Sequence, residues 1–390
     1  MSSIFAERME TLGTETAFEV LAKAKALEKQ GKDIVHLEIG EPDFDTPKNI
    51  KDAAIKALHD GYTHYVSAAG IPELRETIAK YISKTRNIEV KPEEVVVTPG
   101  AKPIMFFSLL ALVNFGEEVM YQNPGFPIYE SVINFVGAKP VPIPLEEEND
   151  FRLDPEYVKE KITKNTKLII LNSPENPTGG VLTREDLKAI ADCIADRDDI
   201  FVLSDEVYSR IIYEGGHESI ASLSGMKEKT ILLDGYSKTY AMTGWRLGYG
   251  VMRKDLAQKI TQLMINSNSC TCAFVQMAGV EALNGPQDEA KRMVAEFKRR
   301  REIIVPGLNS IKGITCRKPR GAFYVFPNIA GTGMGCRKLS DYLLNNAGVA
   351  VLPGTAFGQY GEDYLRLSFA NSIENIEKAL GRISEAVENL

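Results

Sequence analysis

The chain has 390 residues, of which 44% are hydrophobic and 25% charged, with a formal net charge of −7. This length suits two packed domains, and this composition is that of a folded enzyme rather than a disordered chain. No basic face for nucleic acid is present, and the longest apolar stretch, 104–113, is far shorter than the roughly 20 residues that span a bilayer.

Residues 1–10 carry early acidic side chains and no apolar core followed by a small-residue cleavage site, so we expect a cytoplasmic protein without a membrane partner. The five cysteines are scattered, which predicts reduced and mostly buried thiols. The four histidines lack ligand spacing, so no metal site is expected.

The first legible helix lies near residues 47–60. Thr46 is the expected N-cap, Pro47 fits the first turn and Gly61 ends the helix. Its expected buried stripe consists of Ile50, Ala53, Ala54, Ala57 and Leu58.

Four short aliphatic runs follow, typical of strands buried on both faces: 95–97, 168–171, 200–203 and 231–233. Polar residues come directly after each run, at 98–102, 172–177, 204–208 and 234–238. Alternation of such strands with helices predicts an α/β fold with a mainly parallel mixed sheet flanked by helices. Ligands bind at the carboxyl edge of such sheets, so the four polar segments should meet in one crevice.

The last hundred residues predict a second, smaller α+β domain, with a long charged helix at 288–308 and an amphipathic helix at the end. We expect residues 1–45 to contribute to this small domain, residues 46–285 to form the large domain and residues 286–390 the small C-terminal domain. The glycines of 331–335 do not follow the dinucleotide pattern and are interpreted as a loop.

Five motifs in order resemble the aspartate aminotransferase superfamily, which comprises fold-type I enzymes dependent on pyridoxal-5′-phosphate (PLP). They are IGEPDF (39–44), NPTG (176–179), SDEVY (204–208), SKTYAMTGWRLGY (237–249) and YLRLS (364–368). The resemblance extends over nearly the whole chain. It implies the fold-type I architecture for the predicted sheet and the smaller domain.

The resemblance assigns the cofactor Schiff base to Lys238, whose amine can also shuttle a proton. Asp205 matches the carboxylate that keeps the pyridine nitrogen protonated. Taken alone, such a lysine could lie on the surface and such an aspartate could cap a helix. Tyr208 and Asn176 match the hydrogen-bond donors to the phenolic oxygen of the ring.

The cofactor phosphate needs backbone N–H groups and cations, which a turn that opens a helix provides. By resemblance the phosphate ligands are Gly100, Ala101, Lys102, Ser237 and Arg246. Tyr65 resembles the tyrosine that reaches the phosphate of a neighbouring subunit, which implies a homodimer with active sites at the subunit interface.

Phe126 matches the position at which the family stacks an aromatic side chain, often tryptophan, on the pyridine ring of the cofactor. Arg366 matches the arginine that binds the α-carboxylate of the substrate through two parallel hydrogen bonds. Gly40 matches a loop glycine whose backbone closes over the bound substrate. Lys102 also matches a lysine that one bacterial and archaeal subgroup uses for acidic side chains. Glu15 and Ala17 replace the hydroxyl side chains of that subgroup, so Glu15 could instead repel acidic substrates or attract a basic one.

The sequence therefore predicts a PLP-dependent aminotransferase that moves an amino group between an amino acid and a 2-oxo acid. Aspartate and glutamate are the candidate donors. Other PLP chemistry on an amino acid remains an alternative, namely a Cβ–S lyase, decarboxylase, cyclase or oxidase. A non-catalytic PLP-binding regulatory domain is a weaker alternative because the chain has no spare length for a DNA-binding module.

Overall fold

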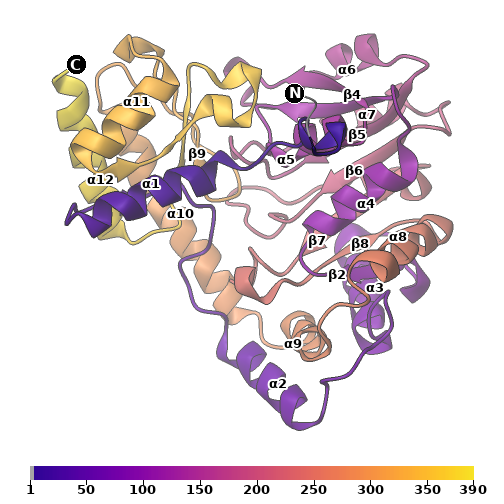
Figure 1. The fold of residues 1–390 in the computed structure, drawn as a ribbon. Coiled ribbons are helices and arrows are strands. Elements are labelled where there is room, and N and C mark those ends of the chain that lie inside the picture. Colours follow the sequence, from indigo (N-terminus) through magenta and orange to yellow (C-terminus); the bar gives the residue numbers. More distant parts are fainter. Residues whose placement is uncertain (1–3) are drawn as a thin grey trace.

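A seven-stranded mixed sheet forms the centre of the protein, which the computed structural model describes over residues 4–390 (Figure 1). Its strands lie in the order β2-β8-β7-β6-β5-β3-β4. Strand β8 is antiparallel to both of its neighbours, and the other pairs are parallel. Their bounds are β2 (Val95–Thr98), β3 (Glu118–Asn123), β4 (Lys139–Pro144), β5 (Thr166–Asn172), β6 (Phe201–Asp205), β7 (Thr230–Gly235) and β8 (Gly248–Val251).

Helices cover both faces of this sheet because its central strands are aliphatic on both sides. One face packs against α4 (Lys102–Leu112), α5 (Ile128–Phe135) and α8 (Lys254–Ser267). The other face packs against α2 (Lys48–His59), α3 (Pro72–Arg86), α6 (Pro155–Lys161), α7 (Arg184–Cys193) and α9 (Ala273–Asn284). None of the helices within residues 4–390 has the length and apolar character of a membrane span.

The C-terminal part of the chain packs beside the sheet together with the N-terminal segment (Figure 1). It contains α10 (Asp288–Asn309), β9 (Tyr324–Val325), α11 (Cys336–Tyr342), β10 (Val349–Ala350), β11 (Leu352–Pro353), β12 (Leu365–Ser368) and α12 (Ile373–Glu388). Strand β1 (Val35–His36) pairs in parallel with β10, and α1 (Thr16–Lys29) crosses from the sheet to the C-terminal helices. The expected domain boundaries at residues 45 and 285 stay predictions.

The four predicted strands are confirmed as β2, β5, β6 and β7, whereas three local expectations were wrong. Thr46 does not cap α2; its hydroxyl donates to the Ala241 carbonyl (2.6 Å) and accepts from the Trp245 indole (2.9 Å). Leu58 is 44% exposed instead of belonging to the buried stripe. All five cysteines are free, but buried thiols occur only at Cys316 and Cys336 among them.

A buried ionic cluster lies behind the carboxyl ends of β6 and β7. Arg86, the last residue of α3, donates to Glu206 (2.6 Å) and lies 3.5 Å from Asp234. Glu206 also pairs with His217 at 2.7 Å. Burial opposes ionisation of Glu206, but His217 and Arg86 lower its pKa to about 2. The cluster therefore ties α3 to β7 and to the loop that follows β6.

Replacing Arg86 with methionine should leave Glu206 buried beside fewer positive charges. We expect the free energy of unfolding, measured by urea denaturation, to fall by about 3 kcal/mol, because breaking a buried ion pair leaves an uncompensated charge. Lys84→Met, at an exposed position of the same helix, is the matched control. A loss no greater than that of the control would contradict a stabilising role for the cluster.

Candidate active site

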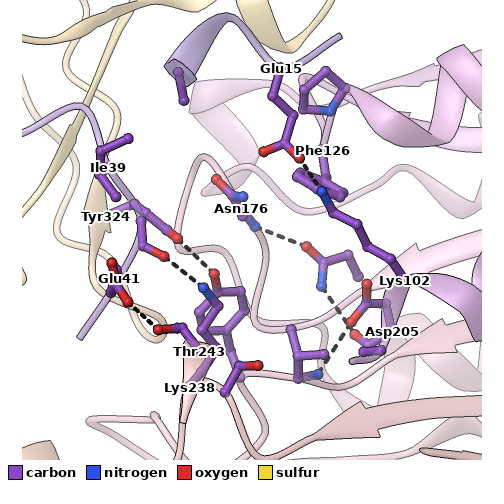
Figure 2. Close-up of a pocket in the computed structure, with 18 of the residues that line it drawn as sticks. Glu15, Ile39, Glu41, Lys102, Phe126, Asn176, Asp205, Lys238, Thr243 and Tyr324 are labelled. Atoms are coloured by element: carbon purple, nitrogen blue, oxygen red, sulfur yellow. Dashed lines mark hydrogen bonds and ion pairs between the residues drawn. The ribbon is translucent and has the colours of Figure 1, made fainter. Parts of the chain in front are cut away.

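A cavity of about 600 Å³ opens at the carboxyl edge of the parallel strands, between the sheet and the C-terminal part (Figure 2). The four polar segments that follow β2, β5, β6 and β7 all contribute to its wall, as predicted. It is lined by eleven of the predicted site residues: Gly40, Ala101, Lys102, Phe126, Asn176, Asp205, Tyr208, Ser237, Lys238, Arg246 and Arg366. Gly100 lies just behind the wall, and Tyr65 does not line the cavity, with its side chain 88% exposed.

Lys238 stands three residues after the end of β7 and points its amine into the cavity. Its Nζ donates a hydrogen bond to the Gly40 carbonyl at 2.6 Å. Loss of hydration lowers the pKa of the Lys238 amine to about 8, although the Glu41 carboxylate opposes this shift. A larger fraction of this amine is therefore neutral near pH 7 than for an exposed lysine, which makes it a better nucleophile.

Asp205 ends β6, the strand beside β7, and its carboxylate is buried. One oxygen accepts from the Tyr129 hydroxyl (2.7 Å) and the other from the Val207 amide (3.3 Å). Burial raises the pKa of Asp205 to about 7, and these hydrogen bonds only partly oppose the shift. No cation of residues 4–390 forms an ion pair with Asp205, so a ligand cation would fit beside it.

The turn between β2 and α4 has the features of an anion site. Gly100 has φ +88°, and a side chain there would overlap the Arg246 guanidinium. Gly248, at the start of β8, leaves equally little room beside the backbone of Gly100 and Ala101. Arg246 donates to the Thr243 carbonyl (2.7 Å) and has no carboxylate partner within residues 4–390. The N-terminal N–H groups of α4 and this cation can together hold a phosphate.

Arg366, on β12, approaches the cavity from the C-terminal part and is buried. It lies over the ring of Tyr324 (4.6 Å from its centroid) and donates to the Asn176 side-chain oxygen at 3.3 Å. Another N–H donates to the Glu38 carbonyl, and Nε has no partner within the described residues. Burial lowers the pKa of Arg366, so a ligand carboxylate would compensate a desolvated charge.

Two tyrosines meet on the same wall. The hydroxyls of Tyr208 and Tyr324 are 2.7 Å apart, and burial raises the pKa of Tyr208 well above its usual value. A side chain at position 40 would overlap the Tyr324 hydroxyl, which explains a glycine there. Tyr324 and Tyr129 also line the cavity, and neither was predicted as a site residue.

Lys102 and Phe126 line the cavity on the side away from Lys238 in Figure 2. The Lys102 amine lies 5.2 Å from the centroid of the Phe126 ring and forms an ion pair with Glu15. Glu15 comes from the N-terminal segment, directly before α1. Three parts of the chain that are distant in sequence therefore meet here.

These residues fit PLP as a cofactor. Lys238 offers an amine of lowered pKa, Asp205 a buried carboxyl that pairs with no cation of the described residues, and the turn at Gly100 an anion cradle. An aldehyde, a protonated ring nitrogen and a phosphate are the three chemical groups that such an arrangement can receive. The cavity volume also suits a ligand of this size together with an amino acid.

Comparison with known proteins gives consistent matches over nearly the full length. The family described as "Aminotransferase class I and II" matches residues 32–383. An aspartate aminotransferase of Pyrococcus horikoshii is 44% identical, covering 98% of the chain and 97% of that protein. Aromatic-amino-acid aminotransferase 2 of Thermococcus litoralis is 40% identical, covering 91% and 92%. The crystal structure of the aspartate aminotransferase from Rhizobium meliloti has a TM-score of 0.95 at 35% identity, covering 99% of both chains.

The raised pKa of Asp205 predicts a pH-dependent effect of Asp205→Asn on the cofactor-free protein. An ordinary aspartate has a pKa of 3.8, and in the fold it is about 7, so the wild type loses stability as the pH rises between these values. The asparagine variant has no such loss. We expect it to be more stable than the wild type, by an amount that grows from about pH 4 to about pH 7 and is constant above.

Thermal unfolding of the cofactor-free protein across this pH range measures the difference. Asp196→Asn, at an exposed position, is the control and should show no such trend. A difference between Asp205→Asn and wild type that does not change with pH would show that the Asp205 carboxyl is not desolvated.

Proposed function

The chain belongs to the class I and II aminotransferases and is a transferase of amino groups. From this we propose that Lys238 holds PLP and that aspartate or glutamate is the amino donor. The observation that carries the proposal is the lowered pKa of the Lys238 amine opposite the buried Asp205 carboxyl in one cavity. When bound, PLP supplies an aldehyde that condenses with amines and a ring that withdraws electrons from the reacting carbon.

Lys238 performs two tasks in this proposal. In the holoenzyme its neutral amine would hold the cofactor covalently, and the same Nζ, when free, would take the proton from the substrate Cα. The Gly40 carbonyl, which accepts from Nζ at 2.6 Å, orients the amine between these tasks. Burial supports both, because a pKa of about 8 leaves the group able to lose and regain a proton near neutrality.

Asp205, Tyr208 and Asn176 orient the ring of the cofactor. The Asp205 carboxylate would pair with the ring nitrogen and keep it protonated, while Tyr129 holds the carboxylate in position at 2.7 Å. Tyr208 and Asn176 would donate to the phenolic oxygen, and Phe126 would stack on the ring. The backbone of the turn at Gly100, Ala101 and Lys102 would bind the phosphate together with Ser237 and Arg246.

Arg366 receives the α-carboxylate of the amino acid or 2-oxo acid, since it is a buried cation without a carboxylate partner within residues 4–390. Lys102 is then the cation left for a second carboxylate, which supports aspartate or glutamate. The Pyrococcus horikoshii relative bears the name aspartate aminotransferase, in agreement with this assignment.

The active unit in this proposal is a cytoplasmic homodimer. Tyr65 is 88% exposed and does not line the cavity of its own chain, so it is available to a phosphate bound by a second copy. Five free cysteines accord with a reducing compartment.

The half-reaction without a 2-oxo acceptor tests the proposed function. On adding glutamate or aspartate, the absorbance of the bound cofactor should change to that of its amine form, with one 2-oxo acid released per site. Lys238→Ala should slow this step by about 10²–10⁴-fold, the effect of losing a general base. Lys259→Ala, at an exposed position, should not. Release of carbon dioxide, hydrogen peroxide, or pyruvate with ammonia would favour the other PLP chemistries instead.

Arg366→Lys keeps the charge but loses the forked geometry that receives a carboxylate through two parallel hydrogen bonds. We expect kcat/KM for the amino acid to fall about 30-fold or more, mainly through KM. Arg317→Lys, at a half-exposed position, is the control. A fall in kcat at unchanged KM would contradict a carboxylate-binding role for Arg366.

A further inference from the structure

The charge of the cavity near Lys102 depends on one carboxylate from the N-terminal segment. Among the described residues that line the cavity, the cations are Lys102, Lys238, Arg246 and Arg366. Lys238, Arg246 and Arg366 donate to carbonyl oxygens, and Lys102 alone of these four forms an ion pair with a carboxylate, that of Glu15. The cation that would receive a second substrate carboxylate is therefore already neutralised by the protein.

Glu15 is held in this place by its own segment. It directly precedes α1, but its side chain accepts no capping hydrogen bond from that helix and extends to Lys102 instead. Two residues earlier, the Gly13 amide donates to the Ser131 hydroxyl (2.8 Å), and Ser131 donates back to the Gly13 carbonyl (3.3 Å). Ser131 lies on α5, which starts just after Phe126. These two hydrogen bonds fix the segment that carries Glu15 against α5, close to Lys102, whose amine lies beside the Phe126 ring.

The wall of the cavity also offers surface for uncharged groups. The Phe126 ring lies beside Lys102, Phe18 belongs to the helix that follows Glu15, and Phe357 and Leu352 lie beside Arg366. An apolar or aromatic side chain can occupy this space while the Glu15–Lys102 pair stays intact. An acidic side chain can bind Lys102 only if Glu15 gives up the pair. Because the Lys102 side chain is 49% exposed, the pair is partly solvated and its exchange for another carboxylate is feasible.

We propose that Glu15 is a specificity-determining residue, which neutralises Lys102 for substrates with apolar or aromatic side chains and competes with acidic side chains for the same ammonium. The proposal rests on the proposed aminotransferase function and extends it from acidic donors to a second class of substrate in the same cavity. It assigns the discrimination between the two classes to one exchangeable ion pair.

Glu15→Gln is the direct test, because it removes the charge and keeps the size of the side chain. In the holoenzyme, the ratio of kcat/KM for aspartate to kcat/KM for phenylalanine should rise about two- to fivefold, where fivefold is the upper effect of a partly exposed ion pair. Lys102→Gln should lower this ratio. Glu19→Gln removes the same charge from an exposed position one helical turn along α1 and should leave the ratio unchanged.

Equilibrium binding provides a readout that does not depend on turnover. By calorimetry with the holoenzyme, Glu15→Gln should bind the unreactive dicarboxylate maleate about two- to fivefold more tightly, and bind 3-phenylpropionate, a monocarboxylate, with unchanged affinity. A rise of less than about twofold in both the kinetic ratio and maleate affinity, or a decrease in either, would overturn the proposal. If the wild-type holoenzyme transaminated neither amino acid, the proposed function itself would fail, which is a distinct result.

Discussion

The removal of two ionisable groups from water, the Lys238 amine and the Asp205 carboxyl, is the constraint on which the site depends. Burial lowers the pKa of Lys238 to about 8 and raises that of Asp205 to about 7. The charged and neutral forms of each group are therefore close in free energy near neutral pH. A ligand cation beside Asp205 would stabilise its charged form, and an aldehyde could react with the neutral amine of Lys238. Asp205 ends β6, and Lys238 follows three residues after the end of its parallel neighbour β7, so the sheet brings both to the same edge.

The loop of residues 39–46 links the site residues that follow the sheet strands to the C-terminal part of the chain. Its Gly40 carbonyl accepts from Lys238, and the Thr46 hydroxyl donates to the backbone carbonyl of Ala241, three residues after Lys238. Between them, Asp43 makes a two-pronged ion pair with Arg300 of α10, at 2.7 and 3.0 Å. Arg366 arrives from that same C-terminal part. The complete cavity thus needs both parts of the chain, and this loop connects their contributions.

The sequence pattern predicted the strands and the residues after them well, because burial on both faces and the carboxyl-edge rule are properties of the sheet as a whole. The prediction from the sequence was wrong where contacts between residues distant in the sequence determine the role of a side chain. Thr46 has the local features of a helix cap, yet its tertiary partners Ala241 and Trp245 use its hydroxyl. The Glu15–Lys102 pair joins positions 87 residues apart, and no local pattern indicates it. Leu58 matches the helical period, but periodicity does not show which side of a helix finds a partner.

The measurement that bears most directly on the account is identification of the residue that carries the cofactor. The protein loaded with pyridoxal-5′-phosphate is reduced with borohydride, digested and analysed by mass spectrometry. The account predicts one modified lysine per chain, at Lys238 in the peptide that also contains Ser237 and Thr239. Stable modification at a different lysine, or none at a loaded and coloured protein, would contradict it.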